Sequence, residues 1–187
     1  MKPREIFFAT SNQGKFREVK ALASRFGLEI KMAPFETVEI QHEDLAEIAK
    51  QTLRQALRRL RAPVFVEDAG LFIKALNGFP GPYSTYAYKT IGVQGILKLL
   101  EGKNDREAYF LSAMAFGDPE LRVKVFTGRS DGVIVWRARG KSGFGFDPIF
   151  QPKGCRRTFA EMKVEEKNKY SHRANAFKKL AEWLIGS

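Results

Sequence analysis

Small polar side chains and a lysine follow an apolar run near the start of the sequence, in the stretch FFATSNQGKF. A strand that ends in a polar turn before a helix gathers free backbone N–H groups, and the helix dipole adds partial positive charge there. Thr10, Ser11 and Asn12 would add side-chain donors. Lys15 would add a full charge, and Gly14 would let a ligand approach the backbone. The stretch therefore predicts a phosphate-binding turn.

The same stretch also has a purely structural explanation. It is not a P-loop, because position 9 is alanine and Phe16 follows Lys15 where that motif needs serine or threonine. Ser11 or Asn12 could simply cap a surface helix while Lys15 stays in solvent. On these residues alone, the capping explanation is preferred.

Two adjacent carboxylates, Glu67 and Asp68, stand in VFVEDAG, where we expect a buried strand to end. Ligands of open α/β sheets bind beyond the carboxyl ends of strands. Neighbouring carboxylates repel each other unless a cation offsets them, and hard oxygen ligands suit Mg²⁺. Side chains alternate along a strand, so one of the pair alone could face the site. A turn with solvated acids is the simpler alternative.

An aromatic segment, GFGFDP, could supply a base pocket. Phe144 or Phe146 could stack on a nucleobase beside Asp147. The alternative is a core aromatic residue in a bulged strand.

A basic segment, EKNKYSHRANAF, precedes the last apolar helix and contains Lys167, His172 and Arg173. Cations at a helix N-terminus oppose the dipole, which a phosphate or a carbonyl-rich partner would relieve. The alternative is an ordinary basic cap region with Ser171 as the N-cap.

The elements that must position these residues follow from the apolar periodicity. We predict strands at 4–10, 28–32 and 64–66, helices at 16–26, 45–60, 92–102 and 173–185, and a loop at 77–84. An antiparallel meander is expected over 106–138, with turns at 117–119 and 130–132. Strand–helix alternation followed by a meander predicts an α/β fold with a mixed sheet, in which the meander forms a second lobe and leaves a cleft between the two.

Composition is ordinary for a globular protein, with 187 residues, 44% hydrophobic and 28% charged. The net charge of +11 suits a polyanionic partner, although basic residues are spread along the chain. No apolar run approaches a membrane span, and the apolar stretch at the start is too short for a signal peptide. The single cysteine, Cys155, forbids an internal disulfide. We therefore expect a cytoplasmic protein.

Taken together, the motifs resemble the inosine triphosphate pyrophosphatase (Ham1-like) family. ATSNQGK, VEDAGL with GFPGPYS, GFGFDPIF and FAEMKVEEKNKYSHRANAF occur in family order and span nearly the whole chain. The resemblance implies one two-lobed domain over 1–187, with an elongated mixed β-sheet flanked by helices and the active site between the lobes. It implies hydrolysis of ITP, dITP and XTP to monophosphate and pyrophosphate, a need for Mg²⁺, and a homodimer.

The resemblance also implies roles for individual residues. Substrate would be bound by Thr10, Ser11, Asn12, Gln13, Gly14, Lys15, Ala69, Phe144, Gly145, Phe146, Asp147, Lys167, His172 and Arg173. Glu39 and Asp68 would ligate magnesium, with Glu67 as a neighbouring candidate. Asp68 would also activate water, and Lys15 would stabilise the charge that builds on the leaving group.

Two departures from the family pattern bear on phosphate affinity. Many members have a lysine at about Thr52, and the bacterial pattern often has an arginine near Thr85. Two rival functions also stay open: a basic RNA-binding module without catalysis, and a phosphatase that releases orthophosphate.

Overall fold

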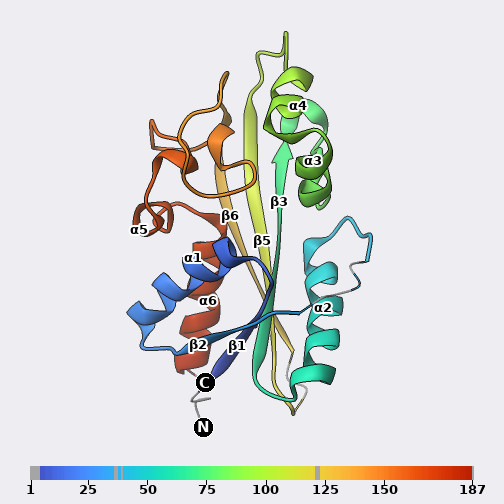
Figure 1. Cartoon of the computed structure of the whole chain (residues 1–187), viewed down its shortest axis with the longest axis vertical. Helices are drawn as coiled ribbons and strands as arrows, with labels where there is room; N and C mark the ends of the chain where they lie inside the picture. Colours follow the sequence, from blue (N-terminus) through green and yellow to red (C-terminus); the bar gives the residue numbers. More distant parts are fainter. Residues whose placement is uncertain (1–4, 36–37, 39, 121–122, 187) are drawn as a thin grey trace.

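In the part of the chain that the computed structural model describes, residues 5–35, 38, 40–120 and 123–186, seven strands form one open mixed sheet with helices on both faces (Figure 1). The strands are β1 (Ile6–Ala9), β2 (Ile30–Ala33), β3 (Val64–Ile73), β4 (Pro80–Gly81), β5 (Glu107–Gly117), β6 (Lys124–Ile134) and β7 (Phe150–Pro152). The helices are α1 (Gln13–Ala23), α2 (Leu45–Leu60), α3 (Ser84–Thr90), α4 (Gly92–Leu99), α5 (Val164–Lys167) and α6 (His172–Gly186). The predicted α/β class, with an elongated mixed sheet, is confirmed.

The connections around β1 create the position that a ligand site needs. The strand order is β2-β1-β3-β5-β6-β7, and β1 is parallel to both of its neighbours. The chain leaves β1 through α1 to β2 on one side and reaches β3 on the other side through α2, and the two helices cover opposite faces of the sheet (Figure 1). The carboxyl end of β1 is therefore a topological switch point, where open α/β sheets bind ligands.

Apolar clusters on both faces hold the elements together. One cluster packs α1 and α6 on the sheet around the stacked rings of Phe8 and Phe65, whose centroids lie 4.5 Å apart. A second cluster buries the apolar stripe of α2, including Leu53 and Leu57, against the opposite face. The stripe at 45–60 matches the predicted helix, and Asp44 caps it by accepting a hydrogen bond from the N–H of Ala46. These clusters fix the sheet on which the candidate site is built.

The predicted end of the strand at 64–66 was wrong. β3 continues to Ile73, and it pairs antiparallel with β5 from Val64 opposite Gly117 to Ile73 opposite Ala108. Glu67 and Asp68 therefore lie within a strand and not in a turn after it. Ladder hydrogen bonds to β5, far away in sequence, outweigh the local preference of acidic residues and glycine for turns.

The predicted turn at 130–132 was also wrong. β6 runs through these residues, and Gly132 lies between Ala108 of β5 and Pro152 of β7. A Cβ at Gly132 would stand 2.3 Å from the carbonyl oxygen of Gln151. The glycine is thus needed for the close approach of β7 and does not mark a turn.

The other irregular segments agree with the sequence in part. The turn region after 117 is confirmed, whereas the stretch 77–84 contains β4 and a cis peptide bond before Pro80 in addition to loop residues. The helix predicted at 92–102 ends at Leu99. Among the described residues, no helix has the length and apolar character needed to cross a bilayer.

Candidate active site

Side-chain caps organise the turn that follows β1. Thr10 Oγ1 accepts a hydrogen bond from the N–H of Asn12 (3.1 Å), and Asn12 Oδ1 accepts one from the N–H of Lys15 (3.0 Å). The Ser11 hydroxyl lies 3.3 Å from the backbone oxygen of Phe35. Asn12 is therefore the N-cap of α1, so the capping explanation holds locally.

The cap leaves other donors of the same turn available. Among the described residues, the N–H groups of Gln13 and Gly14 have no protein acceptor, because they belong to the first turn of α1. They lie at the switch point after β1, where the dipole of α1 adds partial positive charge. The segment 10–15 thus has the geometry of an anion-binding turn.

Lys15 extends from this turn to β3. Its Nζ forms an ion pair with Glu67 Oε2 (2.9 Å) and donates a hydrogen bond to the Glu67 carbonyl oxygen (3.0 Å). The Glu67 carboxylate is buried, accepts a hydrogen bond from Ser112 Oγ (2.6 Å) and pairs with Arg173 Nη2 (3.2 Å). Burial alone would raise the pKa of Glu67, but Arg173 and Lys15 outweigh it and hold that pKa below its ordinary value.

The chain of charges continues beyond Arg173 toward the aromatic segment. Arg173 Nη1 contacts Glu18 Oε2, Lys167 Nζ contacts Glu18 Oε1, and Lys167 Nζ also contacts Asp147 Oδ2, each at 2.6 Å. Asp147 Oδ2 in turn accepts a hydrogen bond from the N–H of Phe144 (2.9 Å). Burial raises the pKa of Asp147 despite the charge of Lys167.

Glu18 is the member of this chain that sequence reasoning missed. Burial alone would raise the pKa of Glu18, yet Arg173 and Lys167 hold it below its ordinary value. Its backbone oxygen accepts a further hydrogen bond from Asn168 Nδ2 (3.0 Å). A carboxylate on the buried side of α1, one turn after Lys15, is the signal that could have marked it, because a buried charge needs a partner.

Phe144 and Phe146 have different environments. The Phe144 ring lies 4.9 Å from Lys167 Nζ and 5.4 Å from Arg173 Cζ, and it is only partly buried. Phe146 is 3% exposed and belongs to a third apolar cluster, which also contains Ile96 of α4 and Phe110 of β5. Gly145, with φ +61°, turns the chain between the two rings. Of the two candidates, Phe144 is the ring that borders the charged site.

Phe144 also touches the turn at 10–15. A Cβ built on Gly14 would stand 2.5 Å from Phe144 Cδ1. The absence of a side chain at position 14 therefore lets the aromatic segment close against the first turn of α1. The two motifs, far apart in sequence, form one site.

His172 is buried beside the same charges, and its ring stacks on Phe110 with centroids 4.6 Å apart. Both ring nitrogens lack a hydrogen-bond partner among the described residues, as does Arg173 Nε. Burial and the neighbouring Arg173 hold the pKa of His172 well below its usual value. The ring is therefore neutral at pH 7 and keeps one donor and one acceptor.

Asp68 and Ala69 pair with β5 on one side of β3, but on the other side, between β1 and β4, no described strand pairs with them. Among the described residues, β1 pairs with β3 only at Val64 and Phe65, and β4 pairs with it at Leu71 and Phe72. Asp68 Oδ1 accepts a hydrogen bond from the N–H of Ala69 (2.9 Å). Asp68 follows directly on Glu67 within β3, so the two side chains point to opposite faces of the strand, and Asp68 is next in sequence to the residue that contacts Lys15.

The structure describes two of the three predicted metal ligands, Glu67 and Asp68. Glu39 lies outside the described residues. Glu67 Oε2 forms an ion pair with Lys15 but accepts no hydrogen bond from a described residue, and Oε1 accepts the Ser112 hydroxyl and pairs with Arg173, so a metal ion at Glu67 would stand beside two cations. Within the described ranges, no group of three or more histidine, cysteine or acidic residues could hold a metal ion. The Asp68 carboxylate fits Mg²⁺, which keeps several waters and binds through few carboxylates plus phosphate oxygens.

The two departures noted in the sequence map to α2 and α3. Thr52 is half-buried within α2, and the nearby Lys50 forms an ion pair with Glu47 of the same helix at 2.6 Å. Thr85 is exposed in α3. Neither position belongs to the chain of charges described above.

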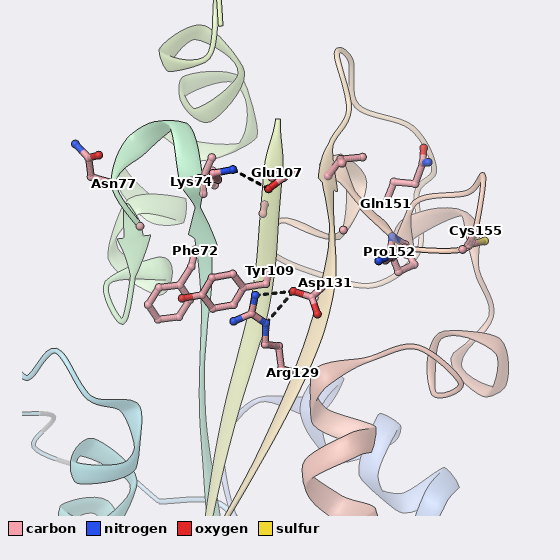
Figure 2. A pocket seen from close by; sticks show the side chains of 17 residues that line it. Phe72, Lys74, Asn77, Glu107, Tyr109, Arg129, Asp131, Gln151, Pro152 and Cys155 are labelled. Atoms are coloured by element: carbon pink, nitrogen blue, oxygen red, sulfur yellow. Dashed lines mark hydrogen bonds and ion pairs between the residues drawn. The ribbon is translucent and has the colours of Figure 1, made fainter. Parts of the chain in front are cut away.

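A separate hollow of about 810 Å³ lies on the sheet over β3, β5 and β6, and Figure 2 shows its lining. There the rings of Phe72 and Tyr109 stack, and the Arg129 guanidinium lies 3.7 Å from the Tyr109 ring while Asp131 accepts its hydrogen bonds. None of the predicted site residues lines this hollow. The candidate site is therefore defined by the residues at the end of β1 and not by this hollow.

Comparison with protein families identifies a match over nearly the whole chain. The model of the Ham1 family matches residues 6–183.

Curated relatives agree with this match. A dITP/XTP pyrophosphatase of Saccharolobus solfataricus is 51% identical over 180 residues, which cover 96% of this chain and 93% of the relative. A dITP/XTP pyrophosphatase of Thermococcus kodakarensis is 50% identical over 179 residues, covering 96% of both chains. Among solved structures, a HAM1 protein from Coxiella burnetii is 33% identical with a TM-score of 0.84, covering 98% of this chain and 99% of that one.

Proposed function

The chain belongs to the Ham1 family, and from this membership we propose that it hydrolyses non-standard purine nucleoside triphosphates such as dITP, XTP and ITP. The products are the nucleoside monophosphate and pyrophosphate, so the reaction removes these nucleotides from the cellular pool. The observation that carries the proposal is one buried chain of ion pairs that links the anion-binding turn after β1 to the aromatic segment at Phe144.

In this proposal the turn at 10–15 binds the triphosphate. The N–H groups of Gln13 and Gly14 donate to phosphate oxygens, and the hydroxyls of Thr10 and Ser11 add further donors. Lys15 supplies a fixed positive charge near the pyrophosphate that leaves. Ala69 contributes its backbone along the edge of β3.

Asp68 acts as the general base toward the attacking water. Asp68 adjoins Glu67, whose backbone oxygen accepts a hydrogen bond from Lys15, and a carboxylate within hydrogen-bond reach of water can accept its proton. Asp68 and Glu39 would hold Mg²⁺, which when bound shields phosphate charge and polarises the phosphoryl group. Cleavage at the α-phosphate follows the pyrophosphatase names of the relatives.

The base is recognised between Phe144 and the polar groups behind it. Hypoxanthine and xanthine carry an acceptor, O6, where adenine carries an amino donor. Arg173 Nε and the His172 ring are buried without partners among the described residues, and they can pair with the 6-oxo edge. Opposite adenine, a donor left unpaired would cost about 1–3 kcal/mol.

The remaining expectations complete the proposal. The residues 1–187 act as one two-lobed domain, since β3, β5 and β6 run through both halves (Figure 1). We propose a cytoplasmic homodimer, and light scattering at micromolar concentration should give twice the 21.2 kDa chain mass. A monomer mass would contradict the dimer without affecting the proposed reaction.

Anion-exchange analysis of a dITP or ITP digest tests the proposed reaction. We expect monophosphate plus pyrophosphate, and we expect chelation of divalent ions to stop the reaction. Diphosphate plus orthophosphate would instead indicate the alternative phosphatase. Intact substrate across Mg²⁺ concentrations and pH values, together with salt-sensitive RNA binding, would favour the basic RNA-binding module.

A further inference from the structure

Six charged side chains alternate in sign along one line through the candidate site. The order is Lys15, Glu67, Arg173, Glu18, Lys167 and Asp147, and the five links measure 2.9, 3.2, 2.6, 2.6 and 2.6 Å. The line begins at the phosphate-binding turn and ends at the loop that carries Phe144. Each interior member therefore has an opposite charge on both sides.

Glu67 is the link that joins the two ends. It comes from β3, whereas its two cations come from different helices, Lys15 from α1 and Arg173 from α6. Its side chain is fully buried, and Ser112 on β5 fixes Oε1 with a 2.6 Å hydrogen bond. The Ser112 side chain is itself buried. The orientation of Glu67 is thus set by the sheet and not by the helices that it connects.

We propose that Glu67 is a positioning residue that fixes Lys15 on the phosphate side and Arg173 on the base side relative to the sheet, and that it is not a metal ligand. This inference rests on the proposed function, because it assigns the two cations to the two ends of a nucleotide. Glu67 acts through these cations and does not contact substrate itself.

The coordination of Glu67 argues against a metal role. One oxygen already carries the ammonium of Lys15, and the other carries the hydroxyl of Ser112 and the guanidinium of Arg173. Mg²⁺ needs an oxygen lone pair at about 2.0–2.1 Å and would stand directly beside the positive charges of Lys15 and Arg173. The adjacent Asp68 offers a carboxylate on the strand edge without displacing these cations.

The proposal predicts that removing the charge of Glu67 changes binding affinity differently at the base end and at the phosphate end of the nucleotide. Without the charge of Glu67, Arg173 keeps Glu18 as its one carboxylate partner among the residues that the structure describes, and it loses its fixed orientation toward the base. At the phosphate end, loss of a negative charge removes repulsion of a polyanion while it releases Lys15. Base recognition should therefore weaken, whereas ground-state binding of phosphate should not.

The primary variant is Glu67→Gln, which keeps an acceptor for Ser112 but removes the charge. Calorimetry without metal would measure the affinities for IMP, which reports the base end, and for tripolyphosphate, which reports the phosphate end. We expect the IMP affinity to fall about 10-fold or more, as for a lost charge-assisted hydrogen bond, and the tripolyphosphate affinity to stay equal or increase. In turnover, the preference for dITP over dATP should fall by a similar factor, while the Mg²⁺ concentration for half-maximal rate stays unchanged.

A second variant, Ser112→Ala, keeps the proposal testable if Glu67→Gln does not fold. Ser112→Ala retains every charge and only releases the orientation of Glu67, so it should shift the IMP affinity in the same direction by a smaller factor. Ser130→Ala is the matched control, because Ser130 is a buried serine on the adjacent strand β6 and makes no contact with the chain of charges. Its IMP and tripolyphosphate affinities should equal those of the native chain. Glu67→Asp should recover part of the preference for dITP.

Several results would overturn the proposal. A raised Mg²⁺ requirement in Glu67→Gln, with the dITP preference intact, would make Glu67 a metal ligand. Equal changes in Ser112→Ala and Ser130→Ala would reduce its role to general packing. Failure of the proposed function would be seen separately, as absence of pyrophosphate release by the native chain, while the metal-free affinities still report on Glu67. A native chain that binds neither probe would overturn both.

Discussion

Replacing Gly14 with alanine tests whether the phosphate-binding turn and the base pocket form one site. The new Cβ would stand 2.5 and 2.7 Å from two carbons of the Phe144 ring. Carbon atoms in contact prefer about 3.5–4.0 Å, so the ring must retreat by about 1 Å. Because Phe144 borders the proposed base pocket, the substitution should weaken base stacking although position 14 belongs to the phosphate end.

The expected magnitudes separate binding from stability. Stacking of a base on an aromatic side chain contributes about 1–3 kcal/mol, so loss of the Phe144 position should raise the KM for dITP about 5- to 150-fold. Alanine in a helix is favoured over glycine by about 1 kcal/mol, so the free energy of unfolding should stay equal or rise. Pyrophosphate release at varied dITP concentration and urea unfolding followed by circular dichroism measure the two quantities.

A double-mutant cycle with Phe144→Ala decides whether the ring carries the effect. In the Phe144→Ala background, Gly14→Ala should raise KM no further, since the group that it displaces is gone. An undiminished rise there would refute the reasoning, because the new methyl group would then act on the phosphates directly. The Asn12 side chain lies 3.1 Å from the same Cβ, and a disturbed cap would be recognised by a lower free energy of unfolding.

Three further predictions follow from individual side chains. Asp68→Asn should lower kcat by about 10²-fold or more with an unchanged thermal melt, and a near-normal kcat would remove Asp68 as the general base. Phe146→Ala should lower the free energy of unfolding by about 3–5 kcal/mol, measured by urea unfolding, because Phe146 is buried. Phe144→Ala should chiefly raise the KM for dITP. Equal losses of stability in the two variants would contradict the different burial of the two rings. Because the buried His172 has a lowered pKa, the unfolded chain binds more protons than the folded chain below about pH 6.5, and the free energy of unfolding should fall as the pH is lowered from 8 to 5. His172→Gln should flatten the pH dependence of stability measured by urea unfolding, and an unchanged pH dependence would exclude His172 as its source.

Local sequence patterns were sufficient for α1, α2, α4 and α6 and for the class of fold, whereas the short helices α3 and α5 were not predicted. The stripe at 45–60 repeats at helical spacing and ends before Pro63, and nothing distant is needed to recognise it. The turn after β1 was found for the same reason, since strand, cap and helix are consecutive in sequence. These features depend on residues within a few positions of one another.

Features that depend on distant partners were missed or misread. Glu67 and Asp68 resemble a turn until β5 is known to pair with them, with Asp68 opposite Ala113. Glu18 resembles any helical surface acid, because its partners Lys167 and Arg173 stand 149 and 155 positions further along the chain. A single sequence carries no direct record of such pairings, so the position of Glu18 on the apolar side of α1 could suggest burial but could not name its partners.

The alternation of charge also changes how the net charge of +11 should be interpreted. The six linked side chains carry three positive and three negative charges, so the chain of ion pairs is neutral when all of them are ionised. A neutral network cannot itself attract a triphosphate over long distances, and the excess of basic residues lies elsewhere on the protein. In the proposed site, attraction of a triphosphate would therefore come from the N–H groups of Gln13 and Gly14, the dipole of α1 and a divalent cation, with Lys15 acting at short range. The buried network instead fixes where Lys15 and Arg173 stand, and this is why we expect its disruption to reduce selectivity among purines more than affinity for phosphate.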